Sequence, residues 1–248
     1  MNNHNGKNSM ITTVTTVSAA SAVIQRNVQI MRITLALTVL SFITFSIALT
    51  SSYWVVITYP PEFLAVRQNL FIVRTTYGII WECALSRPTK TSMYENRCDY
   101  HPNQVHNTST PADQTLVGMV RTMMSFSAIH ILLLIITFIC GLYSIREYRY
   151  TYKRLTGMIY ILTAASLLVC IEVLSTIFRH ASEHLPEIYP KGTKHSFGIC
   201  YILAWLIFIL LLVSSLAFFV CSKKRKGAFD EATEEEALAN VPVTLGRI

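Results

Sequence analysis

The sequence predicts an all-α membrane protein whose four spanning helices carry a small β-sheet. Two observations predict this fold. The chain of 248 residues is 52% apolar and only 14% charged, and its apolar residues gather in four long runs. Between the first two runs, the segment from Trp54 to Cys98 is rich in Val, Ile, Thr and Tyr. Such residues favour strands, and Cys83 and Cys98 suit two strands joined by a disulfide in an oxidising compartment.

Each apolar run is predicted to be a transmembrane helix. The runs cover residues 33–50, 122–143, 155–178 and 197–221. Each approaches or exceeds the roughly 20 residues needed to cross a hydrocarbon core of about 30 Å. Backbone polar groups in lipid must be satisfied within the segment, so helices are expected. The first run ends at Ala48-Leu49-Thr50, a poor cleavage site, and is expected to be a retained helix and not a signal peptide.

The net charge of +7 is concentrated beside the ends of these runs. Basic residues fill the link between the second and third runs and directly follow the fourth: Arg146, Arg149, Lys153, Arg154, Lys223, Lys224, Arg225 and Lys226. The positive-inside rule therefore places both termini in the cytoplasm and residues 51–121 and 179–196 outside the cell. This distribution predicts contact with membrane lipid and no nucleic-acid partner. The resulting organisation is a mobile cytoplasmic tail at 1–30, a membrane domain at 31–226 and a cytoplasmic tail at 227–248.

The first outer segment divides into a β-prone half and a polar half. Residues 52–57 and 70–83 favour strands, with a turn at Pro60-Pro61 between them. After Cys83 the segment becomes polar and proline-containing, and it is predicted to be a loop. This half contains Asn107, which begins an acceptor triplet for N-glycosylation on the side predicted to be external.

Two ionisable residues lie near the outer ends of the predicted helices. Arg121 is at the start of the second run, and Glu172 lies about six residues short of the outer end of the third, or roughly 9 Å at the helical rise. A charge at that depth must face protein or water, so Glu172 is predicted to pair with Arg121 inside the bundle. Glu172 either fixes helix packing, protonated or hydrogen-bonded inside the bundle, or takes part in proton or ion transfer, and the sequence leaves both open.

No motif predicts an enzyme, a cofactor or a metal site. The chain lacks a phosphate-binding Gly-rich loop, a Gly-x-Ser-x-Gly turn and a Cys-x-x-Cys pair. His180 and His184 flank Glu183 at helical spacing, but a zinc site normally uses three or four protein ligands, so a solvated cluster at the membrane surface is expected. An intramembrane hydrolase or hydroxylase that uses His130 together with this pair is the catalytic alternative.

The cytoplasmic side offers candidates for modification and docking. Cys140 and Cys221 lie near inner helix ends and are equally suited to palmitoylation or to a buried position. The chain ends at Ile248, an apolar C-terminus that a groove on a cytoplasmic scaffold could capture. Gly246, however, stands where the commonest ligands of such grooves have Ser or Thr.

These features together resemble the superfamily of claudins, peripheral myelin protein, epithelial membrane proteins and calcium-channel gamma subunits. The resemblance covers about residues 30–226 and rests on four spans, internal termini, a large first outer segment and one series of residues. The series is Trp54, Gly78-Ile79-Ile80-Trp81, Cys83 and Cys98. The stretch from Ser196 to Trp205 is similar to the start of the last helix in the peripheral myelin and epithelial membrane branch. Arg121 matches an arginine that the superfamily carries at the start of its second helix.

The sequence also departs from the family pattern. The family usually has Gly-Leu-Trp followed by two residues before the first cysteine, whereas here only Glu82 separates Trp81 from Cys83. The chain also lacks the Tyr-Val ending of claudins. Both departures argue against a strict tight-junction claudin.

The resemblance implies a fold, a location and a way of acting. The fold is a left-handed four-helix bundle with a small antiparallel sheet from both outer segments, a disulfide between Cys83 and Cys98, and Trp54 and Trp81 where the sheet meets the membrane. The location is the plasma membrane. The implied partners are copies of this chain or related proteins in the same or the facing membrane, in adhesion or a paracellular barrier. The alternative function is an auxiliary subunit of a channel or receptor.

A charge-selective pore is not predicted. Five acidic and five basic residues lie between positions 51 and 115, so the first outer segment has no net charge. A charge-selective filter would need a dominant sign.

Overall fold

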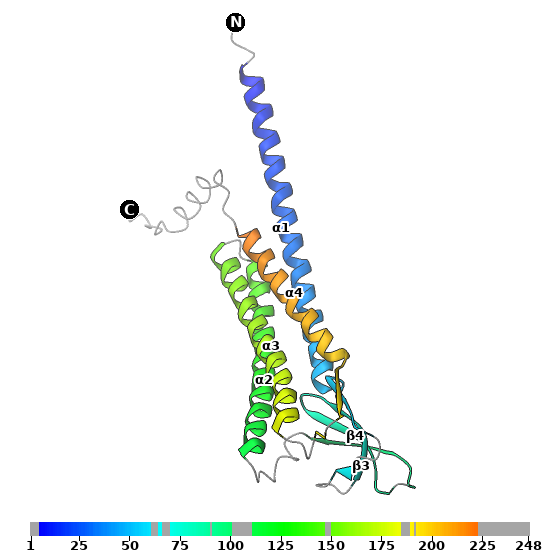
Figure 1. The fold of residues 1–248 in the computed structure, drawn as a ribbon. Helices are drawn as coiled ribbons and strands as arrows, with labels where there is room; N and C mark the ends of the chain where they lie inside the picture. The colour runs from blue at the N-terminus through cyan, green and yellow to red at the C-terminus, as the bar shows by residue number, and fades with distance from the viewer. Residues whose placement is uncertain are drawn as a thin grey trace, which may run out of the picture.

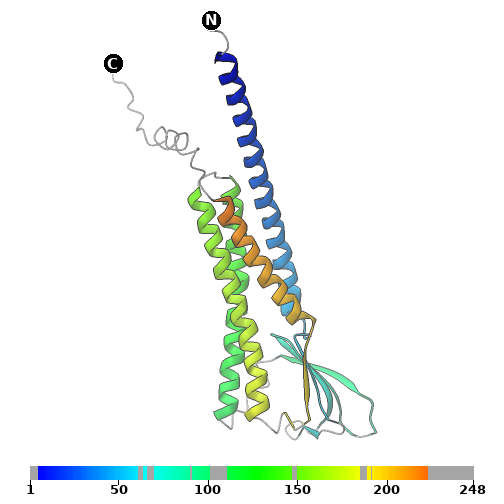
Figure 2. The same cartoon turned by 45° about the horizontal axis from the view of Figure 1, so that its top comes forward.

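A computed structural model shows four long helices, with an antiparallel sheet at one end of the bundle (Figure 1). The structure describes residues 5–60, 64–65, 70–89, 91–100, 111–146, 150–184, 189–190 and 192–222. Helix α1 ends beside the sheet and α4 begins there (Figures 1 and 2). The start of α1 and the end of α4 lie on the side of the bundle away from the sheet.

The four helices are long enough to cross a membrane. Helix α1 spans Asn5–Thr50, α2 spans Pro111–Arg146, α3 spans Tyr150–His184 and α4 spans Ile199–Cys221. Within the described residues, each contains a candidate span of 23 to 34 residues with a mean hydropathy between 2.1 and 2.8. The four predicted spans are therefore confirmed, although the first three helices extend well beyond the predicted apolar runs.

Helix α1 differs most from its prediction. Residues 1–30 were expected to form a mobile cytoplasmic tail before the first span, and helix α1 begins at Asn5. Extending a helix costs little once it is nucleated, because each added residue gains a backbone hydrogen bond. The stable spanning part supplies that nucleus, and the preceding segment contains no proline that would stop the helix.

The helices pack in the order α1–α2–α3–α4 around the bundle, with α4 returning against α1. Tyr160 of α3 is fully buried and stacks on Phe218 of α4, with the ring centroids 5.3 Å apart. Hydroxyl groups also join neighbouring helices. Thr137 and Thr163 link α2 to α3 at 2.9 Å, and Ser215 Oγ of α4 donates to the carbonyl of Gly157 at 2.9 Å.

The sheet draws strands from both segments that connect the helices at this end. Its strands are β1 (Val55–Thr58), β2 (Leu64–Ala65), β3 (Leu70–Tyr77), β4 (Trp81–Arg87), β5 (Glu95–Tyr100) and β6 (Lys194–Phe197). All pairs are antiparallel, in the order β5-β4-β3-β1-β6, and β2 pairs with β3. The β-sheet therefore joins the α1–α2 connection to the α3–α4 connection.

Two predictions about the first outer segment are corrected. Residues 70–83 form not one extended stretch but two strands, separated by a turn that begins at Gly78. The polar half predicted as loop contains the end of β4 and the whole of β5. Every residue of β5 is exposed, so the strand shows no apolar alternation that sequence reasoning could detect.

Candidate functional site

The sheet is joined to the bundle through the connector between α1 and β1. Trp54 is fully buried in this connector. Its indole Nε1 donates a hydrogen bond of 2.6 Å to the carbonyl of Ala48, and its ring meets Phe45 edge to face, with the centroids 6.5 Å apart. A buried indole needs both apolar neighbours and an acceptor for its N–H. The last turns of α1 provide both, and Trp54 lies at the junction of the sheet and the bundle.

Two glycines allow other segments to approach this connector closely. A Cβ at Gly78 would overlap the carbonyl oxygen of Ser51. A Cβ at Gly198 would overlap the carbonyl oxygen of Tyr53 and lie 2.8 Å from its carbonyl carbon. The Gly198 N–H also donates to the carbonyl of Trp54 at 2.8 Å. Glycine is required at both positions because backbone passes directly against backbone. Sequence reasoning identified Gly78 but missed the role of Gly198.

The predicted disulfide between Cys83 and Cys98 is confirmed. The two residues lie directly opposite each other on β4 and β5, with an S–S distance of 2.07 Å. Strand β5 is at the edge of the sheet and pairs with β4. The bond therefore ties down a polar edge strand that buries no apolar side chain of its own.

A row of polar side chains crosses the sheet on the face turned toward α3. Tyr77, Glu82 and Asp99 lie opposite one another on β3, β4 and β5. The Tyr77 ring meets Phe178 of α3 edge to face, with the centroids 5.5 Å apart. Glu82 is 8% exposed, and Tyr77 is its hydrogen-bond partner. The pKa of Glu82 is raised from 4.5 to about 7, because burial raises it most, the hydrogen bond with Tyr77 lowers it and the charge of Asp99 raises it.

Two further tyrosines extend this polar cluster. Burial raises the pKa of Tyr59 to about 12, against the effect of its hydrogen bond with Thr75. Tyr189, from the α3–α4 connection, shares a hydrogen bond with Tyr77. Burial, followed by nearby Tyr and Glu82 groups, raises the pKa of Tyr77 and Tyr189 well above the usual range. The phenols therefore stay protonated and act as hydrogen-bond donors within the cluster.

Sequence reasoning treated Glu82 only as the spacer between Trp81 and Cys83. The alternation of a strand could have revealed it, because neighbouring residues point to opposite faces. With Trp81 and Cys83 on one face, Glu82 must lie on the other.

The opposite face of the sheet exposes aromatic side chains. Trp81 of β4 meets Tyr100 of β5 edge to face at 5.8 Å, and these side chains are 41% and 39% exposed. The Arg87 guanidinium lies over the ring of Tyr94, 4.9 Å from its centroid, and Met93 beside it is 90% exposed. We call these five residues the outer face. Trp81 was expected at the seam with the membrane domain, and its side chain is instead half exposed on the outer face.

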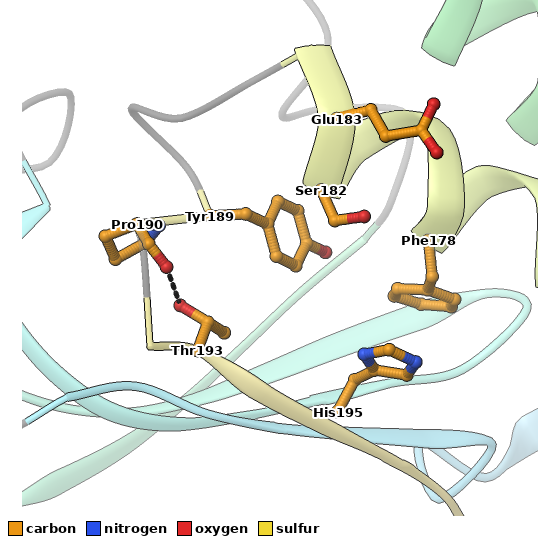
Figure 3. Close-up of a pocket in the computed structure, with 7 residues that line it drawn as sticks. All are labelled: Phe178, Ser182, Glu183, Tyr189, Pro190, Thr193 and His195. Carbon is orange, nitrogen blue, oxygen red and sulfur yellow. Dashed lines mark hydrogen bonds between the residues drawn. The ribbon is translucent and has the colours of Figure 1, made fainter.

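A pocket of about 310 Å³ lies between the end of α3 and β6 (Figure 3). Its lining residues are Phe178, Ser182, Glu183, Tyr189, Pro190, Thr193 and His195. Ser182 Oγ donates to the carbonyl of Arg179 at 2.9 Å, so its hydroxyl is directed at its own helix and not at a neighbouring base. The pocket borders the polar cluster through Tyr189 but does not bring a nucleophile and a base into hydrogen-bond contact among the residues that Figure 3 draws.

The histidines do not form a metal centre in the described part of the chain. His180 and His184 stack on each other, with centroids 4.4 Å apart, and the Nδ1 of His184 lies 3.2 Å from the carbonyl of His180. His130 is buried in the bundle, where Nδ1 lies 3.0 Å from Ser166 Oγ. No group of three or more His, Cys, Asp or Glu that could hold a metal occurs among the described residues.

Arg121 and Glu172 were predicted to pair inside the bundle, and both side chains are exposed on its surface. Cys170 and Met123 mark where α3 faces α2, with Cys170 Sγ 4.0 Å from the Met123 carbonyl oxygen. Glu172 is two residues from Cys170 on α3, and Arg121 is two residues from Met123 on α2. Two residues correspond to about 200° around a helix. They therefore point away from the α2–α3 interface.

Other predicted sites are only partly described. Asn107 and the C-terminal tail with Ile248 lie outside the described residues. Cys140 is a half-buried free thiol, and Cys221 is buried, which favours the structural alternative for Cys221.

Comparison with known families agrees with this architecture. A family model described as PMP-22/EMP/MP20/Claudin tight junction matches residues 39–220, a range that includes the last turns of α1, the sheet, α2, α3 and nearly all of α4. The chain is therefore a multi-pass plasma-membrane protein that belongs to the PMP-22/EMP/MP20/claudin family.

Proposed function

We propose that the protein acts by contact through the outer face of its sheet, and that this contact supports adhesion or a barrier between cells. In this proposal the sheet lies outside the cell and both termini are cytoplasmic, as the distribution of basic residues favours. The bundle provides the anchor in lipid.

The observation that carries the proposal is the cluster of exposed aromatic side chains on the outer face. Trp81, Tyr94 and Tyr100 are 39% to 49% exposed, and Met93 is almost fully exposed. Trp, Tyr and Arg are the residue types that most often dominate binding energy at protein interfaces. The disulfide holds β4 and β5 together, so these side chains are presented on a rigid support.

The chemistry of the site supports contact and not catalysis. The polar cluster around Glu82 is buried, and its carboxyl and hydroxyl groups hydrogen-bond to one another: Tyr77 bonds to both Glu82 and Tyr189. Membership of the family points in the same direction. We infer that the partner is another copy of this chain or a related family member in the same or the facing membrane.

The proposal can be tested in non-adherent cells that express the full-length chain with a fluorescent tag. We expect the protein to concentrate where two expressing cells touch. Replacing Met93 and Tyr94 with Ser should remove this enrichment, because both side chains are exposed and their loss should leave the fold intact.

The matched control is Tyr53→Ser, which removes an equally exposed tyrosine from the connector and not from the outer face. It should leave the enrichment unchanged. A chain that reaches the cell surface but never concentrates at contacts would refute the proposal. If that chain also copurified with one large channel polypeptide in mild detergent, the auxiliary-subunit alternative would replace it.

A further inference from the structure

We propose that the sheet binds a sulfated glycosaminoglycan chain through three basic residues on the face opposite α3. These residues are Lys194 of β6, Arg74 of β3 and Arg87 of β4, and we call them the basic strip. The partner is a polyanion and not another copy of this chain. Its access to the strip rests on the proposed placement of the sheet outside the cell.

The carboxylates of the sheet gather on the face turned toward α3. Glu82 and Asp99 lie opposite each other on β4 and β5 and belong to this face. Glu95 lies opposite Ser86, which is four residues from Glu82 on the same strand and therefore on the same side. The described strands contain no other Asp or Glu, so all three of their carboxylates are on this face.

Within the described strands, the opposite face carries basic residues and no carboxylate. Thr58 of β1 lies between Lys194 of β6 and Arg74 of β3, and it is paired with both. Cross-strand partners share a face, and all three side chains are exposed. Arg74 is also paired with Leu85 of β4, and Arg87 is two residues further along that strand. Arg87 therefore lies on the same face.

The three cations form a line that crosses the strands. Neighbouring strands are about 4.8 Å apart, so Lys194 and Arg74, which are separated by β1, are about 10 Å apart at the backbone. Arg74 and Arg87 are diagonal neighbours on adjacent strands, at about 7–8 Å. This spacing suits an extended polymer with repeated anionic groups better than one small anion.

The line lies away from the membrane. Val55 and Phe197 are paired at the ends of β1 and β6 that adjoin the helices. Thr58 and Lys194 are three residues further along these strands, or about 10 Å at the strand rise. Figure 1 shows the sheet at the end of the bundle. This position favours a polymer in solution over the headgroups of an anionic lipid.

The groups beside the cations suit a sugar chain. Thr58 provides an exposed hydroxyl, and Asn96, which is paired with Leu85, provides an exposed amide in the same row. At the end of the strip, the exposed ring of Tyr94 lies 4.9 Å from the Arg87 guanidinium. Guanidinium groups donate paired hydrogen bonds to oxyanions, and an aromatic ring packs against apolar C–H groups. This combination favours a sulfated polysaccharide over an acidic peptide.

Binding is tested on intact cells that make no glycosaminoglycans and express the full-length chain. The probe is fluorescent heparin, a sulfated glycosaminoglycan, and its binding is divided by the amount of chain found by cell-surface labelling. In the proposed orientation, the basic residues of the cytoplasmic segments are out of its reach. We expect expressing cells to bind heparin but not desulfated heparin. Binding should weaken as salt rises, because exposed charges are screened.

Neutral variants locate the binding site. Arg74→Gln and Lys194→Gln should each raise the Kd about threefold, and the double variant about tenfold, as expected for exposed ion pairs. Arg74→Lys keeps the charge and should retain most of the binding. The matched control is Arg97→Gln, which removes an exposed cation from β5. Arg97 is paired with Ala84 on the face toward α3, so its loss should leave the Kd unchanged.

Several results would overturn the proposal: equal binding of desulfated heparin, a wild-type Kd in both strip variants, or the same loss in the Arg97→Gln control. If Arg74→Gln does not reach the surface, Lys194→Gln on the edge strand β6 decides alone.

Purified full-length protein in detergent separates the two proposals when cells bind no heparin. Heparin binding that still depends on Arg74 and Lys194 would show that the strip works but the sheet does not face outward, which refutes the extracellular partner. Absence of binding in both assays would refute the strip alone. If the same variants lost binding only to phosphatidylserine vesicles, an anionic lipid would replace the polysaccharide.

Discussion

The buried carboxyl of Glu82 should make the stability of the sheet depend on pH. Its pKa is raised from 4.5 to about 7 in the folded protein, mainly by burial. Below pH 4.5 the group is protonated in both the folded and the unfolded chain and costs nothing. Above about pH 7 the folded protein must hold a buried charge, so the contribution of Glu82 to stability is lost as the pH rises through this window.

The size of the effect follows from the pKa. A difference of one pKa unit corresponds to about 1.4 kcal/mol, so the rise from 4.5 to about 7 corresponds to about 3 kcal/mol between the two ends of the window. Glutamine has nearly the same shape as protonated glutamate and can still accept the hydrogen bond from Tyr77. Glu82→Gln should therefore leave stability unchanged near pH 4 and increase it by up to about 3 kcal/mol above pH 7.

The assay is thermal unfolding of purified protein in detergent from pH 4 to pH 8, followed by tryptophan fluorescence. Trp54 and Trp81 both lie in or beside the sheet and report on it. The matched control is Glu95→Gln, which removes an exposed carboxylate from the neighbouring strand and leaves Glu82 in place. The pH dependence assigned to Glu82 should persist in this control. If Glu82→Gln kept the wild-type pH dependence, or destabilised the protein at every pH, burial would not be the cause we describe.

Two further changes test the junction between the sheet and the bundle. Gly198→Ala should prevent correct folding and delivery to the cell surface, because its Cβ would overlap the Tyr53 carbonyl. The control Gly118→Ala should be delivered normally, because a Cβ at Gly118 meets nothing within 4 Å. Cell-surface labelling measures delivery, and equal delivery of both variants would contradict this reasoning. Trp54→Phe should lower the free energy of unfolding by about 1–3 kcal/mol, because it removes the indole N–H that donates to the buried Ala48 carbonyl. An unchanged melting temperature would show that this hydrogen bond contributes nothing to stability.

The helices were predictable because lipid imposes one simple rule on composition and length. Their ends were not, since helices α2 and α3 continue past the hydrocarbon core and the sequence there no longer has to be apolar. Strand β5 escaped prediction for a different reason. It is exposed on both faces and is held by backbone pairing and the disulfide, neither of which leaves an alternating pattern.

The predicted pairing of Arg121 with Glu172 inside the bundle considered only the depth of the two residues. Sequence position gives the depth of a residue in a span, but its direction depends on how the helix is rotated against its neighbours. The contact between Cys170 and Met123 supplies that rotation and turns both charges outward.

The sheet depends on the bundle for its folding, which leads to a last prediction. Residues 51–100 contain β1 to β5 and the disulfide but lack β6, which pairs with β1 and arrives only after α3. They also lack Ala48, which accepts the Trp54 N–H, and Phe178, which covers Tyr77. An oxidised peptide of residues 51–100 should therefore be unfolded in water, because a chain this short buries too little surface to offset its conformational entropy. A well-dispersed NMR spectrum with cooperative thermal unfolding would show that the bundle is not needed.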